Sequence, residues 1–305
     1  MFKKLYFFAL VALAAVSCNN KESRMDRFVP VTVHVNDFMV TVDTFSDTKA
    51  AQSAADYTGV KAIVLAFYDG ETEIYKSEQV KSQATEQNPF GEFTCSLPLG
   101  TYTMVVLGYG KDMEDEITLI SPTLATYDCP HSRETFAATK TVTISGTSAN
   151  NLEATLSRIV SKLQVASSDP RPSSAAKIRY TFTAGGKSFN PTTGFATVNN
   201  GFSNTVGISA NPGTTSLSTC YLFLTTQEAT MNVTIEVLDE SENVINRKVV
   251  TNVPFRLNRC TKLTGSIYSA STSASSFLLD PDWLEIQEIN FLSFISEHFP
   301  GREVL

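Results

Sequence analysis

A period of two in the apolar residues is the feature that most constrains the fold of this chain. Apolar and polar residues alternate over Val31–Val35 and again over Phe38–Val42, on either side of Asn36–Asp37. Such alternation places the apolar side chains on one face of a β-strand. Asn and Asp are frequent in tight turns, so the sequence predicts two strands joined by a hairpin at Asn36–Asp37.

Similar stretches recur along the chain and indicate an all-β protein. Val60–Tyr68 is apolar enough for a buried strand that ends at the turn Asp69–Gly70, and Tyr102–Tyr109 is apolar on both faces, as in a central strand. Short strands separated by turn residues favour β-sandwich packing. Further strand-like stretches follow at Ala176–Thr183, Thr219–Thr225, Met231–Leu238 and Val244–Val250.

The segment Leu152–Val165 has two interpretations. Its apolar residues fit one face of a helix, and they also fit two short strands. Propensity alone does not decide between them, so both interpretations stay open.

The length of the chain favours two domains. A chain of 305 residues is long for one domain and comfortable for two. The sequence therefore predicts a first β-sandwich at residues 29–150 and a second at residues 151–289. A tail at residues 290–305 has a short amphipathic helical pattern, which could dock on its own domain or on a partner.

The first eighteen residues have the pattern of a lipoprotein export signal. Lys3 and Lys4 form a short positive region, Leu5–Val16 is apolar, and small residues precede Cys18. The apolar run is too short to span about 30 Å of hydrocarbon. We therefore expect a signal peptide at residues 1–17, a lipid on the Cys18 thiol, and a polar tether at residues 18–28.

Charge and motif content exclude several classes of function. The net charge is −7 at pH 7 and the chain has no basic run, so nucleic acid is not an expected partner. The sequence has no G-x-S-x-G, H-E-x-x-H or phosphate-loop motif, and Gly185–Ser188 lacks the first glycine of such a loop. We expect no catalytic residue, no cofactor and a non-enzymatic role.

Four cysteines follow Cys18, at Cys95, Cys129, Cys220 and Cys260. Disulfides are open to them in an exported chain, but Cys95 and Cys220 alternate with apolar residues, as inward-facing strand positions do. Burial as small apolar residues is the favoured interpretation. No pair has the C-x₂-C spacing of a zinc site and the three histidines are scattered, so no metal site is expected.

Four motifs follow one another over nearly the whole chain. They are L-P-x-G-x-Y at Leu97–Tyr102, L-x-R-x-V-x-K-L-x-V at Leu156–Val165, N-V-P-F-x-x-N-R-x-T-x-L-x-G at Asn252–Gly265 and F-x-L-D-x-D-W at Phe277–Trp283. Together they resemble the fimbrillin superfamily of Bacteroidetes, the subunits and membrane anchors of type V pili. The motif positions singled out here are Leu156, Arg158, Lys162, Pro254, Asn258, Arg259, Gly265 and Trp283.

The resemblance implies two tandem transthyretin-like β-sandwiches behind a lipidated N-terminus, on the outward face of the cell outer membrane. Subunits of such pili are joined by strand complementation, in which a strand of one subunit completes the sheet of the next. Polymerising members lose their first strand to a trypsin-like protease, for which Arg24, Arg27 and Lys49 are the candidate cleavage sites in this sequence. Anchor and accessory members keep the lipid and the strand.

Two roles follow from these features. The first is an anchor or accessory subunit of a fimbrium that supports cell adhesion, with other fimbrial subunits as partners. The alternative is a stand-alone surface lipoprotein that binds a glycan or a host protein. Arg158 and Lys162 could bind an acidic group, and Arg256, Asn258 and Arg259 could grip a partner. Solvation, pairing with carboxylates and loop capping are the more ordinary uses of such residues.

Overall fold

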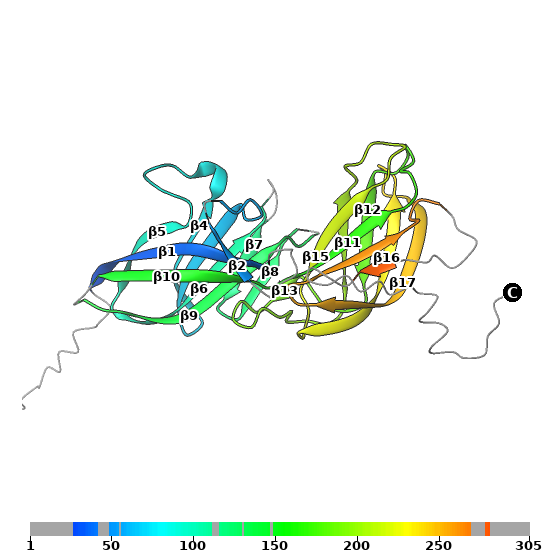
Figure 1. The fold of residues 1–305 in the computed structure, drawn as a ribbon. Helices are drawn as coiled ribbons and strands as arrows, with labels where there is room; N and C mark the ends of the chain where they lie inside the picture. Colours follow the sequence, from blue (N-terminus) through cyan, green and yellow to red (C-terminus); the bar gives the residue numbers. More distant parts are fainter. Residues whose placement is uncertain are drawn as a thin grey trace, which may run out of the picture.

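The computed structural model describes residues 27–41, 49–54, 56–111, 116–129, 131–146, 149–269 and 278–280. In these parts of the chain the regular structure is β, apart from one 3₁₀ turn at Lys81–Gln83. The prediction of an all-β fold is therefore confirmed. The strands form two groups that lie end to end, the earlier strands on the left and the later ones on the right in Figure 1. The predicted signal peptide, Cys18, Arg24, Trp283 and the tail at residues 290–305 lie outside the described residues.

The first group is an eight-stranded sheet of order β2-β1-β10-β9-β6-β3-β4, with β5 paired to β1. One face of this sheet encloses a core of apolar side chains from most of its strands. The strands are β1 (Phe28–Thr41), β2 (Lys49–Ser53), β3 (Ala62–Asp69), β4 (Thr72–Val80), β5 (Glu92–Pro98), β6 (Gly100–Tyr109), β9 (Thr135–Ile144) and β10 (Asn150–Arg158).

The first strand runs without a turn from Phe28 to Thr41, so the predicted hairpin at Asn36–Asp37 is wrong. The ladder between β1 and β10 shifts between Val35 and Asp37, which marks a β-bulge. The extra residue lets Val35 and Phe38 both face the core, where their exposed fractions are 4% and 0%. The switch from odd to even apolar positions thus reflects a bulge within one strand.

Strands β3 and β6 are buried on both faces, as their sequences predict. Leu65 and Val106 face the first core, while Val64 and Leu107 face a second core on the other side of the sheet. A three-stranded sheet of order β13-β8-β7 contributes Leu119, Tyr127 and Phe189 to this second core. Its strands are β7 (Ile117–Ser121), β8 (Leu124–Tyr127) and β13 (Ser188–Phe189).

The second group consists of two four-stranded sheets, of order β15-β11-β18-β19 and β14-β12-β16-β17. Their inner faces share a third core, which includes Leu163 and Leu222 from one sheet and Tyr180 and Ile235 from the other. Two sheets around one core form a β-sandwich. The strands are β11 (Ser161–Ser167), β15 (Leu217–Leu222), β18 (Cys260–Gly265) and β19 (Leu278–Asp280), and β12 (Lys177–Phe182), β14 (Phe202–Gly207), β16 (Glu228–Leu238) and β17 (Val244–Arg256).

The segment with two interpretations forms strands β10 and β11, joined by Ile159–Val160, and not a helix. Strand β10 follows the domain boundary expected near residue 150, yet it pairs with β1 and β9. The chain therefore passes from the first sheet to the second group of strands between Arg158 and Ser161. The division into two domains at residues 29–150 and 151–289 stays a prediction.

The second core joins the two groups of strands. Phe223, directly after β15, stacks on Phe189 with ring centroids 4.2 Å apart and lies 6.2 Å from the Tyr127 ring. The Ser132 hydroxyl donates a hydrogen bond of 2.6 Å to the Tyr221 carbonyl oxygen nearby. Close packing of aromatic rings fixes the position of one group of strands against the other.

Candidate functional site

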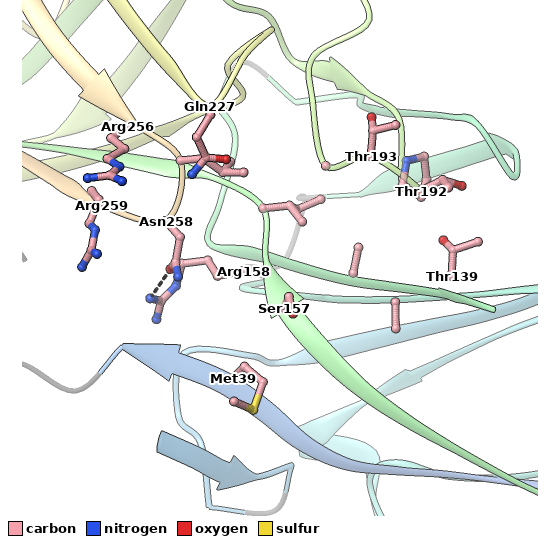
Figure 2. A pocket seen from close by; sticks show the side chains of 16 residues that line it. Met39, Thr139, Ser157, Arg158, Thr192, Thr193, Gln227, Arg256, Asn258 and Arg259 are labelled. Carbon is pink, nitrogen blue, oxygen red and sulfur yellow. Dashed lines mark hydrogen bonds between the residues drawn. The ribbon is translucent and has the colours of Figure 1, made fainter. Parts of the chain in front are cut away.

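Two motif residues from distant parts of the chain meet at the junction between the two groups of strands. Arg158 is the last residue of β10, and Asn258 lies in the turn between β17 and β18. Arg158 Nη1 donates a hydrogen bond of 3.0 Å to Asn258 Oδ1, across 100 residues of sequence. Figure 2 draws this bond as a dashed line. The junction is therefore the place where the second and third motifs come together.

The guanidinium of Arg158 is neutralised by a buried carboxylate. Its Nη2 and Nε lie 2.7 and 2.8 Å from Glu134 Oε1, and the two side chains are only 5% and 11% exposed. Arg158 Nη2 also donates to the Tyr57 hydroxyl at 3.2 Å, and the guanidinium lies 5.0 Å from the centre of the Phe136 ring. Buried charges need such partners. Arg158 has therefore little capacity left for another acidic group.

Tyr57 completes this network as a hydrogen-bond donor. Its hydroxyl donates to Glu134 Oε1 over 2.8 Å. Burial, reinforced by the negative charge of Glu134, raises the pKa of Tyr57 to about 12. The hydroxyl therefore keeps its proton at neutral pH, and the network remains satisfied.

The turn at Arg256–Arg259 is shaped by its own backbone. The Arg259 N–H donates to the Arg256 carbonyl oxygen over 3.1 Å, which closes a β-turn. Asn258 has a φ of 59°, in the left-handed region that Asn tolerates better than most residues. Its N–H donates to the Val160 carbonyl oxygen over 3.0 Å, so the turn is fastened to the link between β10 and β11.

A pocket of about 460 Å³ opens beside this turn. Met39 on β1, Thr139 on β9 and Arg158 line it from the first group of strands, and the turn Arg256–Arg259 lines it from the second. The loop Pro191–Gly194 closes another side. In Figure 2 the side chains of Arg256 and Arg259 lie on one side of the pocket and Thr192 and Thr193 on the opposite side.

Gly194 lets that loop approach the link between the sheets. Its φ is 75°, and a Cβ atom on it would come within 2.8 Å of Ile159 Cγ2. Another residue would therefore be strained by its backbone and would collide with Ile159. Glycine at this position keeps the pocket wall in place.

Two polar atoms at the pocket have no hydrogen-bond partner among the described residues. Arg259 Nη1 and Thr139 Oγ1 are buried and have no hydrogen bond within the part of the chain that the structure describes. No ion pair of the Arg259 side chain is present there either. The sixteen lining residues contain three arginines and no Asp or Glu. The charged side chains among these sixteen residues are therefore all positive.

The other motif positions have structural surroundings. Leu156 is fully buried in the first core, and Lys162 lies on β11, with its backbone N–H bonded to the carbonyl oxygen of Arg259. The Pro254 carbonyl accepts a bond from a threonine hydroxyl, and Gly265 ends β18. None of these four residues lines the pocket.

A second candidate site is the place of β1 in its sheet. Along Phe28–His34 it pairs antiparallel with β5, and along Val31–Met39 it pairs parallel with β10. Arg27 is exposed directly before the strand. Lys49 opens β2, where its backbone pairs with Thr41. Two of the three candidate cleavage sites thus flank the first strand.

Several residues of the junction carry no signal in the sequence. Glu134 is 24 residues from Arg158, in a stretch without clear periodicity, and Tyr57 is 77 residues from Glu134. Thr139 and Gln227 line the pocket but belong to no motif. Only knowledge of which strands are neighbours brings these side chains together.

The described residues contain no group of three His, Cys, Asp or Glu side chains that could hold a metal ion. The four cysteines after Cys18 are buried and form no disulfide within the described residues, and their burial agrees with the favoured interpretation. No helix in the described ranges is long and apolar enough to cross a membrane.

A family model matches residues 29–285, which is most of the chain. The chain belongs to DUF6562, a family of unknown function. A search of curated proteins finds no match to the DUF6562 chain.

Several solved structures of proteins from Bacteroidetes are similar to the chain. A DUF1812 protein of Bacteroides thetaiotaomicron, suggested to bind polysaccharides, is 12% identical, with a TM-score of 0.50 over 86% of the DUF6562 chain and 99% of its own. The fimbrial anchor protein Mfa2 of Porphyromonas gingivalis is 13% identical, with a TM-score of 0.45 over 85% and 100%. A fimbrial assembly protein of Parabacteroides distasonis is 13% identical, with a TM-score of 0.40 over 84% and 96%. At 12% identity the DUF1812 match shows a shared fold and nothing more. The resemblance to the fimbrillin superfamily is confirmed for the fold alone.

Proposed function

We propose that the chain is a lipid-anchored, non-catalytic subunit of a surface fimbrium. It is held at the outer membrane through Cys18 and joined to other fimbrial subunits by strand complementation, in support of cell adhesion. The ordered motifs that resemble the fimbrillin superfamily support this role. The observation that carries it is the place of β1 in the eight-stranded sheet.

Strand β1 is held on both edges and contributes a full row of side chains to the core. Its ladders with β5 and β10 overlap over Val31–His34, so this stretch is bonded on both sides. A sheet without β1 would present two rows of unpaired N–H and C=O groups beside apolar pockets, which is a template for a strand of another subunit. The inward side chains are all 8% exposed or less: Val29, Val31, Val33, Val35 and Phe38.

Cleavage at the basic residues near β1 distinguishes an anchor, which keeps this strand, from a polymerising subunit, which loses it. A cut after Arg24 or Arg27 leaves β1 in the fold, because both residues precede Phe28. A cut after Lys49 separates β1 from the other strands, because Lys49 begins β2. All three cuts also release the chain from a lipid at Cys18. An anchor must therefore stay uncleaved at all three residues to keep its lipid. A polymerising subunit must be cleaved after Lys49 to lose β1.

Strand exchange in solution tests the mechanism. A soluble chain that starts at Asn19 receives a sequence-specific protease site between Thr41 and Lys49. After the cut, a fluorescent peptide of residues 27–41 is added in excess, and its incorporation is followed by size-exclusion chromatography. We expect the peptide to be incorporated. A matched peptide with Val31→Asp and Val33→Asp should stay free, because each aspartate would be buried without a partner. Equal incorporation of the two peptides contradicts strand complementation. So does the failure of both peptides to be incorporated at every temperature up to the Tm of the cut chain.

Deletion of the gene in its own host tests the role. Electron microscopy and blots of a major subunit compare the pili on cells with those shed into the medium. Longer or freely shed pili identify an anchor, and altered tips identify an accessory subunit. A Cys18→Ser strain serves as the control for the lipid, and we expect the protein to leave its membrane fraction. Unchanged pili contradict the fimbrial role and leave a stand-alone binding lipoprotein as the better account.

A further inference from the structure

We propose that the pocket at the junction binds a small carboxylate rich in hydroxyl groups, of the sugar-acid class. The pocket volume, about 460 Å³, lies in the range of small-molecule sites, roughly 300–1,000 Å³. Its walls come from both groups of strands, and the aromatic packing next to it fixes their relative position. The proposal does not rest on a role in fimbriae.

The charge of the pocket selects an anion. Glu134 neutralises Arg158, and Glu228 lies 3.2 Å from Arg256 at the surface. Arg259 has no ion pair among the described residues, so none of the described carboxylates balances its positive charge. A guanidinium matches a carboxylate in shape as well as in charge, because two parallel N–H groups face two oxygens.

The remaining lining favours a ligand with many hydroxyl groups. None of the sixteen described lining residues is aromatic, so none of them offers a ring on which a neutral sugar could stack. The buried Oγ1 of Thr139 has no hydrogen-bond partner within the described ranges, and proteins rarely leave a buried polar atom without one. Hydroxyl and amide groups line the pocket at Thr139, Ser157, Thr192, Thr193, Gln227 and Asn258.

The placement of these groups suits one ligand held at two points. Figure 2 shows Arg256 and Arg259 on one side of the pocket and the Thr192–Thr193 corner facing them. A carboxylate on the arginine side would leave the hydroxyl groups of the same molecule directed at the threonines. The turn Arg256–Arg259 is fastened to the link between the sheets through Asn258, so the arginine side is preorganised.

Calorimetric titration of the full soluble chain from Asn19 tests the proposal. The probes are glucuronate, N-acetylneuraminate, glucose, sulfate and the dipeptide Asp-Asp, all at the same ionic strength. We expect saturable binding of at least one of the two sugar acids and none of glucose. Binding of sulfate alone, or of no probe, overturns the proposal. Binding of the dipeptide without either sugar acid also overturns it, in favour of an acidic peptide.

Three variants locate the binding. Arg259→Gln should weaken it about tenfold or more, because a charge-assisted pair is lost. Thr193 is exposed, so Thr193→Glu should fold, and its carboxylate should weaken binding similarly by repelling the anion. This variant tests the proposal if Arg259→Gln fails to fold. The matched control is Arg247→Gln, an exposed arginine on β17 that does not line the pocket, and it should bind as the parent does. Unchanged affinity in both pocket variants places the ligand elsewhere and overturns the proposal, while the strand-exchange result stays independent.

Discussion

Arg158 and Asn258 are bonded across the junction of the two groups of strands, the guanidinium of one donating to the side-chain oxygen of the other over 3.0 Å. Arg158 is the last residue of β10 in the first sheet, and Asn258 lies in the turn between β17 and β18 of the sandwich. Glu134 supplies the negative charge that lets Arg158 stay buried at this place. The pair therefore joins the two halves of the chain through a satisfied polar network.

Removal of Glu134 should be costly. Glu134→Ala leaves the buried Arg158 without its carboxylate, and we expect a loss of about 3–5 kcal/mol in the free energy of unfolding. Urea unfolding measures this loss. The matched control is Glu228→Ala, which breaks an exposed pair with Arg256 and should cost at most about 1 kcal/mol. Similar losses in the two variants would mean that the buried network contributes no more than a surface pair.

Truncation of Phe38 tests the continuity of β1 through its bulge. Phe38 is fully buried, with its ring centre 5.8 Å from that of Tyr57 and 5.2 Å from that of Phe136. Phe38→Ala should cost about 3–5 kcal/mol through lost burial and a cavity. Phe28, at the exposed start of the same strand, is the control, and Phe28→Ala should change stability by about 0.5 kcal/mol or less. A small effect at Phe38 would contradict the placement of the strand beyond the bulge.

Asp169 should make stability depend on acid pH. Burial alone would raise the pKa of Asp169, but hydrogen bonds from the Ser266 hydroxyl and the N–H groups of Ile267 and Ser269 outweigh it and lower the pKa. A lowered pKa in the folded state gives stability that is complete above the unfolded value, about 3.9, and is lost as pH falls through the folded value. The gap in urea midpoint between the parent and Asp169→Asn should therefore be widest above about pH 5 and shrink below pH 4. A constant gap down to pH 2 would contradict this account.

The four buried thiols should be unreactive until the chain unfolds. Burial raises the pKa of Cys95 to about 11, and it also raises the pKa of Cys220. A thiolate is the reactive form, so a chain that starts at Asn19 should react slowly with dithiobis(nitrobenzoate) at pH 8. In urea the same chain should release four equivalents of thionitrobenzoate, one for each cysteine after Cys18. Two equivalents would indicate a disulfide.

The strands that are buried on both faces could be read from the sequence, because continuous apolar runs such as Val60–Tyr68 leave few alternatives. The segment Leu156–Leu163 could not. Leu156 faces the first core, Ile159 and Val160 the second, and Leu163 the third. The strand, the link and the second strand each place apolar residues in a different core. The resulting spacing of apolar residues matches that of a helix by coincidence.

The candidate site was only partly predictable for a related reason. Local motifs identified Arg158 and Asn258, but the sequence gives no measure of which loops become neighbours. The carboxylate of Glu134 and the hydroxyl of Tyr57 are set beside Arg158 by the order of strands in the sheet. Parallel pairing of β1 with β10, in particular, has no local signal, because the two strands are more than a hundred residues apart.

Strand β1 lies along the long axis of the molecule, beside β10 (Figure 1). Its hydrogen bonds to β5 and β10 run across that axis. A pulling force that enters at Phe28 and is resisted at the far end of the sandwich would load these bonds in shear. They would have to fail together and not one after another, as they do when a strand is peeled away. The geometry thus gives a chain tethered at its amino end high resistance to mechanical extraction of its first strand.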